Sequence, residues 1–337
     1  MPMKTRAVGR TGMHVTELCL GTMTFGFQCN EEASFAILDR AFEAGVRFID
    51  TANVYPLGGS LETVGRTEEI IGRWMRERGN RGSIVLATKC AGAMGSGPND
   101  VGLSRYHVQH AIEASLRRLG TDTIDLYQVH SFDPRTPIEE TLRALDDLVR
   151  QGKVRYIGCS NYPAWRLGQA LAASDKLDIA RYDSVQPRYN LLYREIEPEL
   201  VPLCRTEGLG IIVYNPMAGG FLSGKYQKGE DPWEGSRFTL GSAARRYQQR
   251  YWHDEHFDAV ETFKQAVESR GHTAASVAIS WVLEQPGITA AIVGASDPDQ
   301  LSAPLDAIAL ELDEELRDVC ERVWWRLPRR PVIEGYR

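Results

Sequence analysis

Short apolar runs alternate with longer amphipathic segments along most of the chain. The apolar runs are rich in valine, isoleucine and aromatic residues, a pattern that predicts buried strands. The segments between them repeat their apolar positions with helical spacing, which indicates amphipathic helices. We expect eight strands, at residues 18–21, 46–50, 84–89, 123–130, 154–160, 182–186, 209–215 and 288–294.

Several of the predicted helices carry recognisable end signals. Residues 31–45 and 68–79 each end in glycine, which commonly follows the last turn of a helix. Ser104 is expected to cap a helix over 106–120, because its hydroxyl can accept a hydrogen bond from a backbone N–H of the first turn. These signals support the helical interpretation of the segments between the strands.

The segment 136–152 carries a set of helix-start signals of its own. Thr136 is expected at the N-cap and Pro137 at the first helical position, where its missing N–H costs nothing. Glu139 would complete a capping box, in which the two side chains satisfy each other's backbone N–H groups.

Eight successive strand-then-helix units favour a (β/α)8 barrel, an α/β TIM-barrel fold. Such units form parallel sheets with right-handed crossovers, and eight strands close the sheet on itself. A doubly wound open sheet would need a GxGxxG turn after an early strand, and Gly21 and Gly26 lack that spacing. Residues 1–17 are strand-like around the turn RTG, so we expect a hairpin that plugs the bottom of the barrel. We predict one domain over 1–337, with long loops after the strands and a C-terminal tail over 324–337.

Composition narrows the class of protein further. The net charge of −6 offers no basic face for nucleic acid, and no apolar run approaches the roughly 18 residues of a membrane helix. The N-terminus shows no apolar core of a secretion signal. The six cysteines are scattered without a CxxC pair, which suits reduced thiols better than disulfides or zinc. We therefore expect a cytoplasmic globular protein.

Four groups that handle protons stand at the ends of predicted strands or just after them. Asp50 ends the second strand and Tyr55 follows it, while Lys89 and His130 end the third and fourth strands. In a (β/α)8 barrel these strand ends meet at one rim, where enzymes of this fold place their reactive groups. Each residue alone has an ordinary structural explanation, as a cap, a packing residue, a solvated cation or a hydrogen-bonded histidine. Their convergence on one rim favours a functional site.

Blocks of the sequence resemble the signature blocks of the aldo-keto reductase family, in the family's order and from about residue 4 to about residue 320. The similar blocks are DTANVYPLGGSLETVGRTEEIIG, the Thr-Lys pair at 88–89, LYQVHSFDP, VRYIGCSN, SVQPRYNLL, YNPMAGGFLSGKY and IVGASDPDQL. The long loop after the second strand is most similar to bacterial members related to the potassium-channel β subunit. The resemblance implies a (β/α)8 barrel that reversibly reduces carbonyls with a nicotinamide cofactor and without a metal.

The resemblance also implies a role for each of the four rim residues. Tyr55 would be the general acid that protonates the developing alkoxide, and Lys89 would lower the pKa of that phenol. Asp50 would anchor the lysine ammonium, and His130 would orient the substrate oxygen. In the direction of alcohol oxidation, Tyr55 would act as the base.

The remaining blocks would hold a dinucleotide that lies across the barrel mouth. By resemblance, the nicotinamide end would lie near Thr22, Met23, Gln28, Asp50, Ser160, Asn161, Gln186 and Tyr214. Ser160, Asn161 and Gln186 would hold the carboxamide, and Tyr214 would stack on the ring. Residues 216–240, which we call the clasp, would fold over the cofactor, and their glycines allow close backbone approach to a pyrophosphate. The implied phosphate contacts are Asn215, Pro216, Met217, Ala218, Gly219, Lys225 and Arg237, and the adenosine-phosphate segment holds Gly294, Ser296 and Gln300.

Different residues of the sequence favour different nicotinamide cofactors, NADPH or NADH. Ser296 and Arg237 suit the 2′-phosphate of NADPH, whereas the carboxylate of Asp297 opposes it. Ala303 and Pro304 replace the Glu and Asn that usually hold the adenine in this family. NADPH is the prediction, and NADH is the alternative.

Other functions fit parts of the same pattern. A dehydrogenase that oxidises a sugar or secondary alcohol with NAD or NADP would use the same residues. A non-catalytic regulatory subunit that binds a nicotinamide would often lack one of the four rim groups, all of which are present. A metal-dependent hydrolase would need a cluster such as HxH at a strand end, and neither His130 nor 253–256 supplies one. We expect a small carbonyl or alcohol substrate, without nucleic acid, membrane or metal; nothing in the sequence indicates an oligomer or names the substrate.

Overall fold

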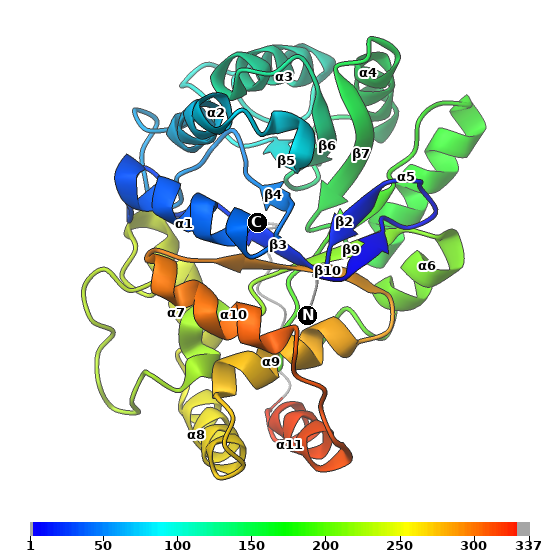
Figure 1. Cartoon of the computed structure of the whole chain (residues 1–337). Helices are drawn as coiled ribbons and strands as arrows, with labels where there is room; N and C mark the ends of the chain where they lie inside the picture. The colour runs from blue at the N-terminus through cyan, green and yellow to red at the C-terminus, as the bar shows by residue number, and fades with distance from the viewer. Residues whose placement is uncertain (1–2, 329–337) are drawn as a thin grey trace.

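Eight parallel strands close into a barrel in the computed structural model, which describes residues 3–328 (Figure 1). Their cyclic order is β10-β3-β4-β5-β6-β7-β8-β9. The predicted barrel is thus confirmed over the open sheet, and each predicted strand is found within a few residues of its expected place. The strands are β3 (Leu18–Gly21), β4 (Phe48–Asp50), β5 (Val85–Cys90), β6 (Ile124–Val129), β7 (Val154–Ser160), β8 (Ser184–Gln186), β9 (Gly210–Tyr214) and β10 (Ile288–Gly294).

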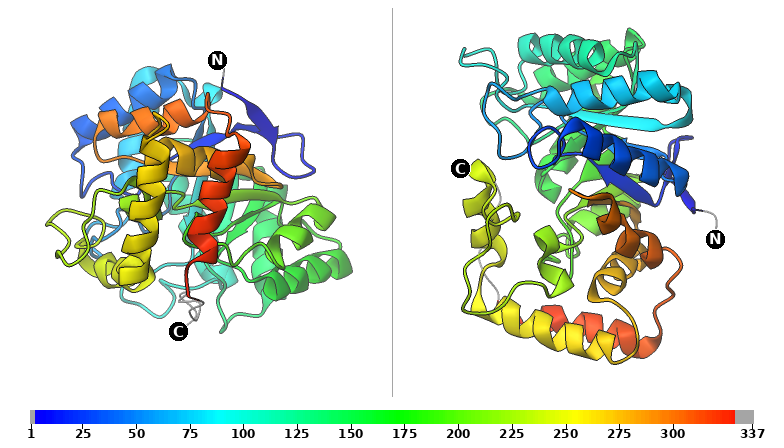
Figure 2. Two further views of the ribbon diagram at one scale, coloured as in Figure 1. Left: turned by 90° about the horizontal axis from the view of Figure 1, so that it is seen from below. Right: turned by 60° about the vertical axis from the view of Figure 1, so that its left-hand side comes forward.

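Helices surround the barrel and connect its strands (Figures 1 and 2). Ser104 caps α3 as predicted, since its hydroxyl oxygen accepts a hydrogen bond from the backbone N–H of His107 (3.2 Å). Gly79 and Gly120 end α2 and α3 in the left-handed conformation. The helices are α1 (Glu31–Glu43), α2 (Arg66–Arg78), α3 (Arg105–Leu119), α4 (Ile138–Arg150), α5 (Ala164–Leu177), α6 (Leu200–Glu207), α7 (Ala244–Tyr251), α8 (Asp254–Glu268), α9 (Ala274–Glu284), α10 (Ser302–Ala307) and α11 (Glu314–Trp325).

The predicted start of α4 is wrong. The helix begins at Ile138, Pro137 occupies the N-cap position, and no side chain caps it. Thr136 instead donates its hydroxyl hydrogen to the carboxylate of Asp133 (2.9 Å), so it is held by the preceding turn. Short polar side chains often choose such local partners, and here the choice removes the capping box expected with Glu139.

The N-terminal hairpin closes one end of the barrel. Its strands, β1 (Thr5–Ala7) and β2 (His14–Thr16), pair antiparallel and lie in front of the barrel in Figure 1. Val8 and Val15 are buried against interior residues of the barrel strands. The predicted hairpin is confirmed, and the opposite end of the barrel is left as the place where the strand ends and loops meet.

The barrel interior changes character along its axis. Near the hairpin it is apolar, because the inward positions of the strands hold small and aliphatic residues or phenylalanine. This layer consists of Cys19, Phe48, Ala87, Leu126, Ile212 and Ala290. Strand side chains alternate with a period of two, so the next inward positions, two residues further on, include Asp50, Lys89 and Gln128. The polar layer therefore lies at the carboxyl ends of the strands, which we call the mouth.

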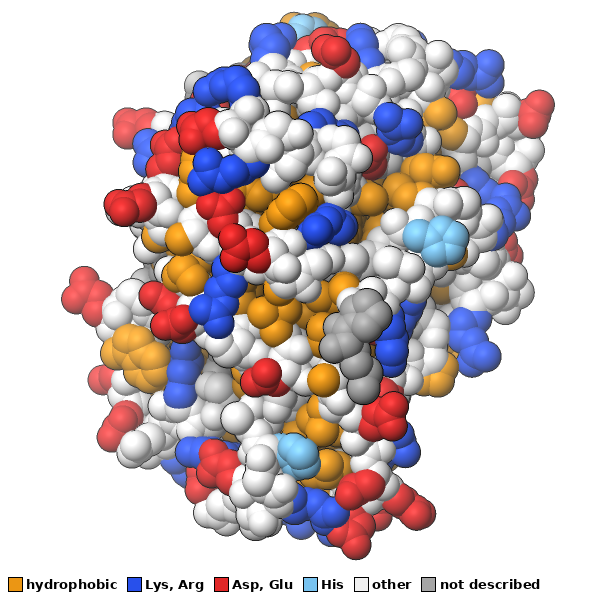
Figure 3. All heavy atoms as spheres, viewed as in Figure 1, with side chains coloured by type: hydrophobic (Ala, Val, Ile, Leu, Met, Phe, Trp, Pro, Cys, Tyr) orange, Lys and Arg blue, Asp and Glu red, His pale blue; other side chains and the backbone are white. Residues whose placement is uncertain are grey.

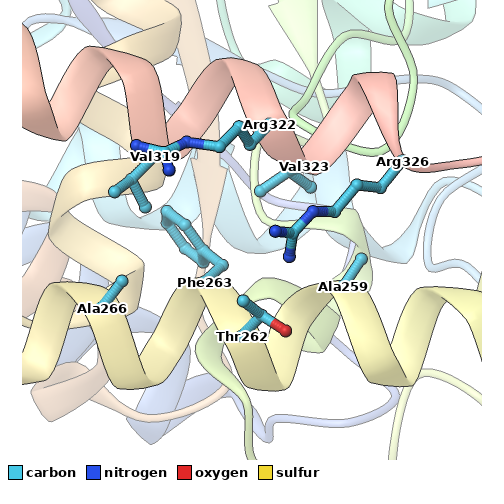
Figure 4. A pocket seen from close by; sticks show the side chains of 8 residues that line it. All are labelled: Ala259, Thr262, Phe263, Ala266, Val319, Arg322, Val323 and Arg326. Carbon is cyan, nitrogen blue, oxygen red and sulfur yellow. The ribbon is translucent and has the colours of Figure 1, made fainter.

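The outer surface of the described residues carries mixed charges on one face (Figure 3) and a small groove between two outer helices. On the face of Figure 1, acidic and basic side chains are interspersed (Figure 3). A groove of about 60 Å³ lies between α8 and α11, on the outer ring of helices (Figure 4), and its lining is mainly apolar with Arg322 and Arg326 at its edge. Among the helices of the described residues, none combines the length and apolar character needed to cross a membrane.

Candidate active site

A buried ion pair lies at the base of the mouth. Lys89 on β5 is fully buried, and its ammonium bonds the carboxylate of Asp50 on the neighbouring β4 and the carbonyl oxygen of Thr51 (2.8 Å). Burial by itself would lower the pKa of Lys89, but Asp50, followed by Tyr55, raises it above its ordinary value. Because its pKa is raised, Lys89 carries its positive charge at neutral pH.

Two amides hold the other carboxylate oxygen of Asp50. Nε2 of Gln128 (3.1 Å) and Nε2 of Gln186 (2.9 Å) both donate to Oδ2, and Gln186 also donates to Oε1 of Gln128 (3.2 Å). Gln128 was not among the predicted site residues. A usable signal was present, because Gln128 precedes His130 by two residues and so shares its inward face of β6. Three side chains, Lys89, Gln128 and Gln186, therefore donate to this carboxylate and fix its orientation.

Tyr55 and His130 complete the group of four rim residues. Their rings meet edge to face, with centroids 5.7 Å apart, and Nζ of Lys89 lies 5.2 Å from the centroid of the Tyr55 ring. Burial raises the pKa of Tyr55, while the charge of Lys89 opposes that rise without cancelling it. The structure thus brings together Asp50, Tyr55, Lys89 and His130, with the phenol protonated at neutral pH and a cation beside it.

His130 is electrically neutral in this setting. Burial, the charge of Lys89 and, to a smaller extent, the charge of Arg246 lower its pKa to about 3. A neutral imidazole keeps one N–H donor, so His130 can donate a hydrogen bond without adding a full charge to the mouth.

We expect the His130 ring to stay neutral from pH 8 down to pH 5 in the folded protein, because its lowered pKa lies below that range. The measurement is a proton–carbon NMR titration of the histidine rings, with the His130 signal assigned by its loss in His130→Asn. In denaturant the same ring is expected to titrate near its ordinary pKa of about 6.5. A His130 signal that titrates between pH 5 and 8 in the folded protein would contradict this environment.

Hydrogen bonds link four of the predicted cofactor residues at the ends of β7, β8 and β9. The Ser160 hydroxyl donates to the carbonyl oxygen of Gln186 (2.8 Å), and Nδ2 of Asn161 donates to Oγ of Ser160 (3.1 Å). The Tyr214 hydroxyl donates to Oδ1 of Asn161 (2.8 Å). Asn161 has a φ of 58°, a strained value that non-glycine residues adopt mainly where the surroundings impose it. These side chains form one connected polar edge of the mouth.

Thr22, Met23 and Gln28 follow β3, as expected, and each forms a hydrogen bond within the protein. The buried Thr22 donates its hydroxyl hydrogen to the carbonyl oxygen of Asp50 (2.9 Å). The carbonyl oxygen of Met23 accepts the backbone N–H of Leu57 (2.9 Å). Nε2 of Gln28 donates to the carbonyl oxygen of Gly235 (2.9 Å) and so ties the clasp to this loop.

The clasp begins with a tight turn that leads into two glycines with positive φ. After β9, Asn215 to Ala218 turn the chain, and Oδ1 of Asn215 accepts the backbone N–H of Gly219 (2.6 Å). Gly219 and Gly220 have φ values of 70° and 89°. A Cβ at Gly219 would lie 3.1 Å from Arg237, and one at Gly220 would lie 3.2 Å from Lys225. The glycine backbone therefore lies directly against the side chains of Arg237 and Lys225. Pro216 and Met217 lie in the turn before it.

The two clasp cations suit an anionic ligand. Nη1 of Arg237 is buried, and no group in the described part of the chain forms a hydrogen bond with it. Burial and the neighbouring Arg237 both lower the pKa of Lys225. Within residues 3–328, no carboxylate forms an ion pair with either residue. Two neighbouring cations beside this glycine backbone fit a phosphate group.

The segment after β10 lies on the same side of the mouth. Oε1 of Gln300 accepts the backbone N–H of Ser296 (3.0 Å), and Nε2 of Gln300 donates to Oγ of Ser296 (3.1 Å), just beyond Gly294. Asp297 caps the short turn that follows, since its carboxylate accepts the backbone N–H of Asp299 (2.8 Å). This capping contact gives a structural reason for an acidic residue at a position expected to oppose a phosphate.

Other features of the sequence lie away from the mouth or outside the description. Residues 253–256 form the start of α8 and the position before it. Across residues 3–328, no three His, Cys, Asp or Glu side chains gather in a potential metal site. All six cysteines are buried and form no disulfide. Of the predicted tail over 324–337, residues 329–337 lie outside the described residues.

Comparison with known proteins agrees with this geometry. Residues 17–324 match the model of the aldo/keto reductase family. The oxidoreductase YrpG of Bacillus subtilis is 39% identical over 93% of this chain and 94% of its own length. A probable voltage-gated potassium channel subunit beta of rice is 36% identical over 99% of this chain and all of its own, and norsolorinic acid reductase of Emericella nidulans is 34% identical over 91% and 78%. With the family model matched along nearly the whole barrel and relatives aligned over most of their length, the chain belongs to the aldo/keto reductase family.

Proposed function

We propose that the protein reduces an aldehyde or ketone to the alcohol with NADPH. The observation that carries this proposal is the protonated phenol of Tyr55 between the ammonium of Lys89 and the neutral ring of His130. A developing alkoxide requires a group that donates a proton, a cation that stabilises the resulting phenolate, and a neutral hydrogen-bond donor.

Each of these side chains then has one task. A bound reduced nicotinamide supplies the hydride that the carbonyl carbon receives. Tyr55 donates its hydroxyl proton to the carbonyl oxygen, and the positive charge of Lys89 stabilises the phenolate that is left. His130 donates a hydrogen bond to the same oxygen and orients the carbonyl. Asp50 holds the ammonium in place, and Gln128 and Gln186 hold Asp50.

The residues that would hold the cofactor surround this group. Ser160, Asn161 and Gln186 would bind the carboxamide, with the oxygen of the Gln186 amide left for this task because its nitrogen donates to Asp50. Tyr214 would stack on the nicotinamide ring. Lys225 and Arg237 would bind phosphate groups under the clasp, and the unpartnered buried Nη1 of Arg237 favours NADPH over NADH.

The direct test is turnover. We expect the purified protein to oxidise NADPH in the presence of 4-nitrobenzaldehyde, followed by the loss of the absorbance of the reduced nicotinamide. We expect NADH to support a lower kcat/KM. Tight binding of NADPH without turnover of any aldehyde in a panel would contradict the proposal and indicate a nicotinamide-binding subunit instead.

Arg237→Ala is expected to weaken NADPH binding by about tenfold or more and NADH binding much less, because only NADPH offers the additional phosphate. Asp297→Asn is expected to strengthen NADPH binding, since asparagine keeps the capping contact and removes the negative charge. Binding is measured by quenching of tryptophan fluorescence. Lys228→Ala is the control, because that clasp lysine pairs with Asp258. Equal loss of both cofactors in Arg237→Ala would contradict the assignment.

A further inference from the structure

The short helix α7 lies across the mouth from one wall of the barrel to the opposite wall. Just before it, Gly241 lies so close to the carbonyl oxygen of Gly58 that a Cβ would collide, which places the helix start over the loop after β4. At the other end, the Tyr251 hydroxyl accepts hydrogen bonds from Nδ2 of Asn190 (3.0 Å) and of Asn215 (2.9 Å), which follow β8 and β9. In the cyclic strand order β4 and β8 are opposite each other. Figure 2 (right) shows α7 on the side of the molecule away from the hairpin.

The faces of α7 are assigned by its contacts. Tyr247 and Tyr251 are buried and form the inner face. Gln248 lies on one flank, because its Nε2 donates to the carbonyl oxygen of Phe238 in the clasp (2.7 Å). At 3.6 residues per turn, Arg246 is rotated by about 100° from Tyr247 in the opposite sense, away from the clasp. Arg246 therefore lies on the flank that faces the half of the mouth built by β5, β6 and β7.

Arg246 lies near the reacting group on this flank. Its charge acts on His130 and lowers the pKa of that ring, after the larger effects of burial and of Lys89. The Arg246 side chain is exposed, and no carboxylate among residues 3–328 forms an ion pair with it. An accessible guanidinium thus stands within electrostatic range of the residue that orients the carbonyl.

The carboxylates of the loops after β5 and β6, on this flank of α7, already have partners. Asp133, after β6, accepts hydrogen bonds from the backbone N–H of Leu103 (3.0 Å) and from the hydroxyl of Thr136 (2.9 Å). Asp100, in the loop after β5, accepts the backbone N–H of Gly97 (2.9 Å). These two carboxylates are therefore held within their own loops. The guanidinium of Arg246 can instead bind an anion that is not part of the described chain.

We propose that Arg246 selects carbonyl substrates that carry a carboxylate a few bonds away from the carbonyl group. A guanidinium binds a carboxylate through two parallel hydrogen bonds, which adds orientation to the charge attraction. With the carbonyl held between Tyr55 and His130, the carboxylate would extend toward the flank of α7. This inference rests on the proposed reductase activity and specifies the class of its substrate.

The test uses two substrates of matched shape, 4-carboxybenzaldehyde and its neutral methyl ester. The wild-type protein is expected to show a kcat/KM about tenfold higher for the carboxylate, mainly through a lower KM. Arg246→Ala is expected to abolish this preference, and Arg246→Glu to invert it in favour of the ester. Added salt is expected to reduce the wild-type preference, because the pair is reached by solvent.

Arg245→Ala is the matched control. Arg245 is the adjacent arginine of α7, but it is exposed and points away from the inner face, so the preference is expected to remain in this variant. If Arg246→Ala lowers kcat/KM equally for both substrates, or if the wild-type protein reduces both equally well, the inference is wrong while the reductase activity stands. If the wild-type protein reduces neither substrate nor 4-nitrobenzaldehyde, the proposed function itself is wrong.

Discussion

Tyr55→Phe is expected to lower kcat for carbonyl reduction by roughly 10²–10⁴-fold, the usual contribution of a general acid. The substitution removes only the hydroxyl group, so the edge-to-face contact with His130 and the packing of the ring are expected to remain. Folding and NADPH binding should therefore survive, as measured by thermal unfolding and by quenching of tryptophan fluorescence. Activity is measured with saturating cofactor and 4-nitrobenzaldehyde.

Tyr106→Phe is the control for the loss of a phenolic hydroxyl, because Tyr106 is exposed on α3 and stacks on His110 away from the ion pair. This variant is expected to retain wild-type kcat. If Tyr55→Phe keeps more than about a tenth of the wild-type kcat, another group donates the proton, and the role of Tyr55 is wrong.

Lys89→Met is expected to lower activity near neutral pH by about 100-fold or more, because the phenolate of Tyr55 loses its stabilising charge. Since Lys89 opposes the rise in the pKa of Tyr55, its removal raises that pKa further. Alcohol oxidation, which needs the phenolate as a base, is then expected to shift to higher pH. An unchanged pH–rate profile would contradict the role of the lysine.

The same variant also leaves the buried carboxylate of Asp50 without its counter-charge, at an expected cost of about 3 kcal/mol in the free energy of unfolding. The double variant Asp50→Asn with Lys89→Met removes both charges and is expected to recover much of that stability while it stays inactive. Urea unfolding of the single and double variants therefore separates the effect on catalysis from the effect on folding. Recovery of activity together with stability would show that the lysine acts only on the fold.

The fold and the four rim residues are visible in the sequence for a physical reason. A buried parallel strand must be apolar on both faces, so a polar residue such as Asp50, Lys89 or His130 at its end interrupts a strong pattern. The eightfold repetition of strand and helix then favours closure, which places these ends together. The glycines of the clasp alone are a weak signal, since such loops often only turn the chain, and their place after the seventh barrel strand is what indicates a phosphate site.

Local signals were less reliable where a side chain had a choice of partners. Thr136 carries the expected pattern of an N-cap, yet its hydroxyl bonds Asp133 in the preceding turn. The capping contact of Asp297 in the turn after β10 is a local contact that the sequence did not indicate. The candidate partners of Thr136 all lie within a few residues, and only the backbone conformation decides between them.

The sequence by itself determined the class of fold through its periodicity, and it indicated the four rim residues through their positions at strand ends or just after them. The roles proposed for these residues came from the resemblance to the family. Only the tertiary structure decided how distant groups meet. Closure of the barrel brings Gln186 onto the carboxylate of Asp50, 136 residues away, and joins both to Gln128. It also brings the Tyr251 hydroxyl of α7 onto Asn190 and Asn215, which follow β8 and β9. Such contacts join segments that are far apart along the chain. No local sequence pattern records that they meet in space, so none predicts the contacts.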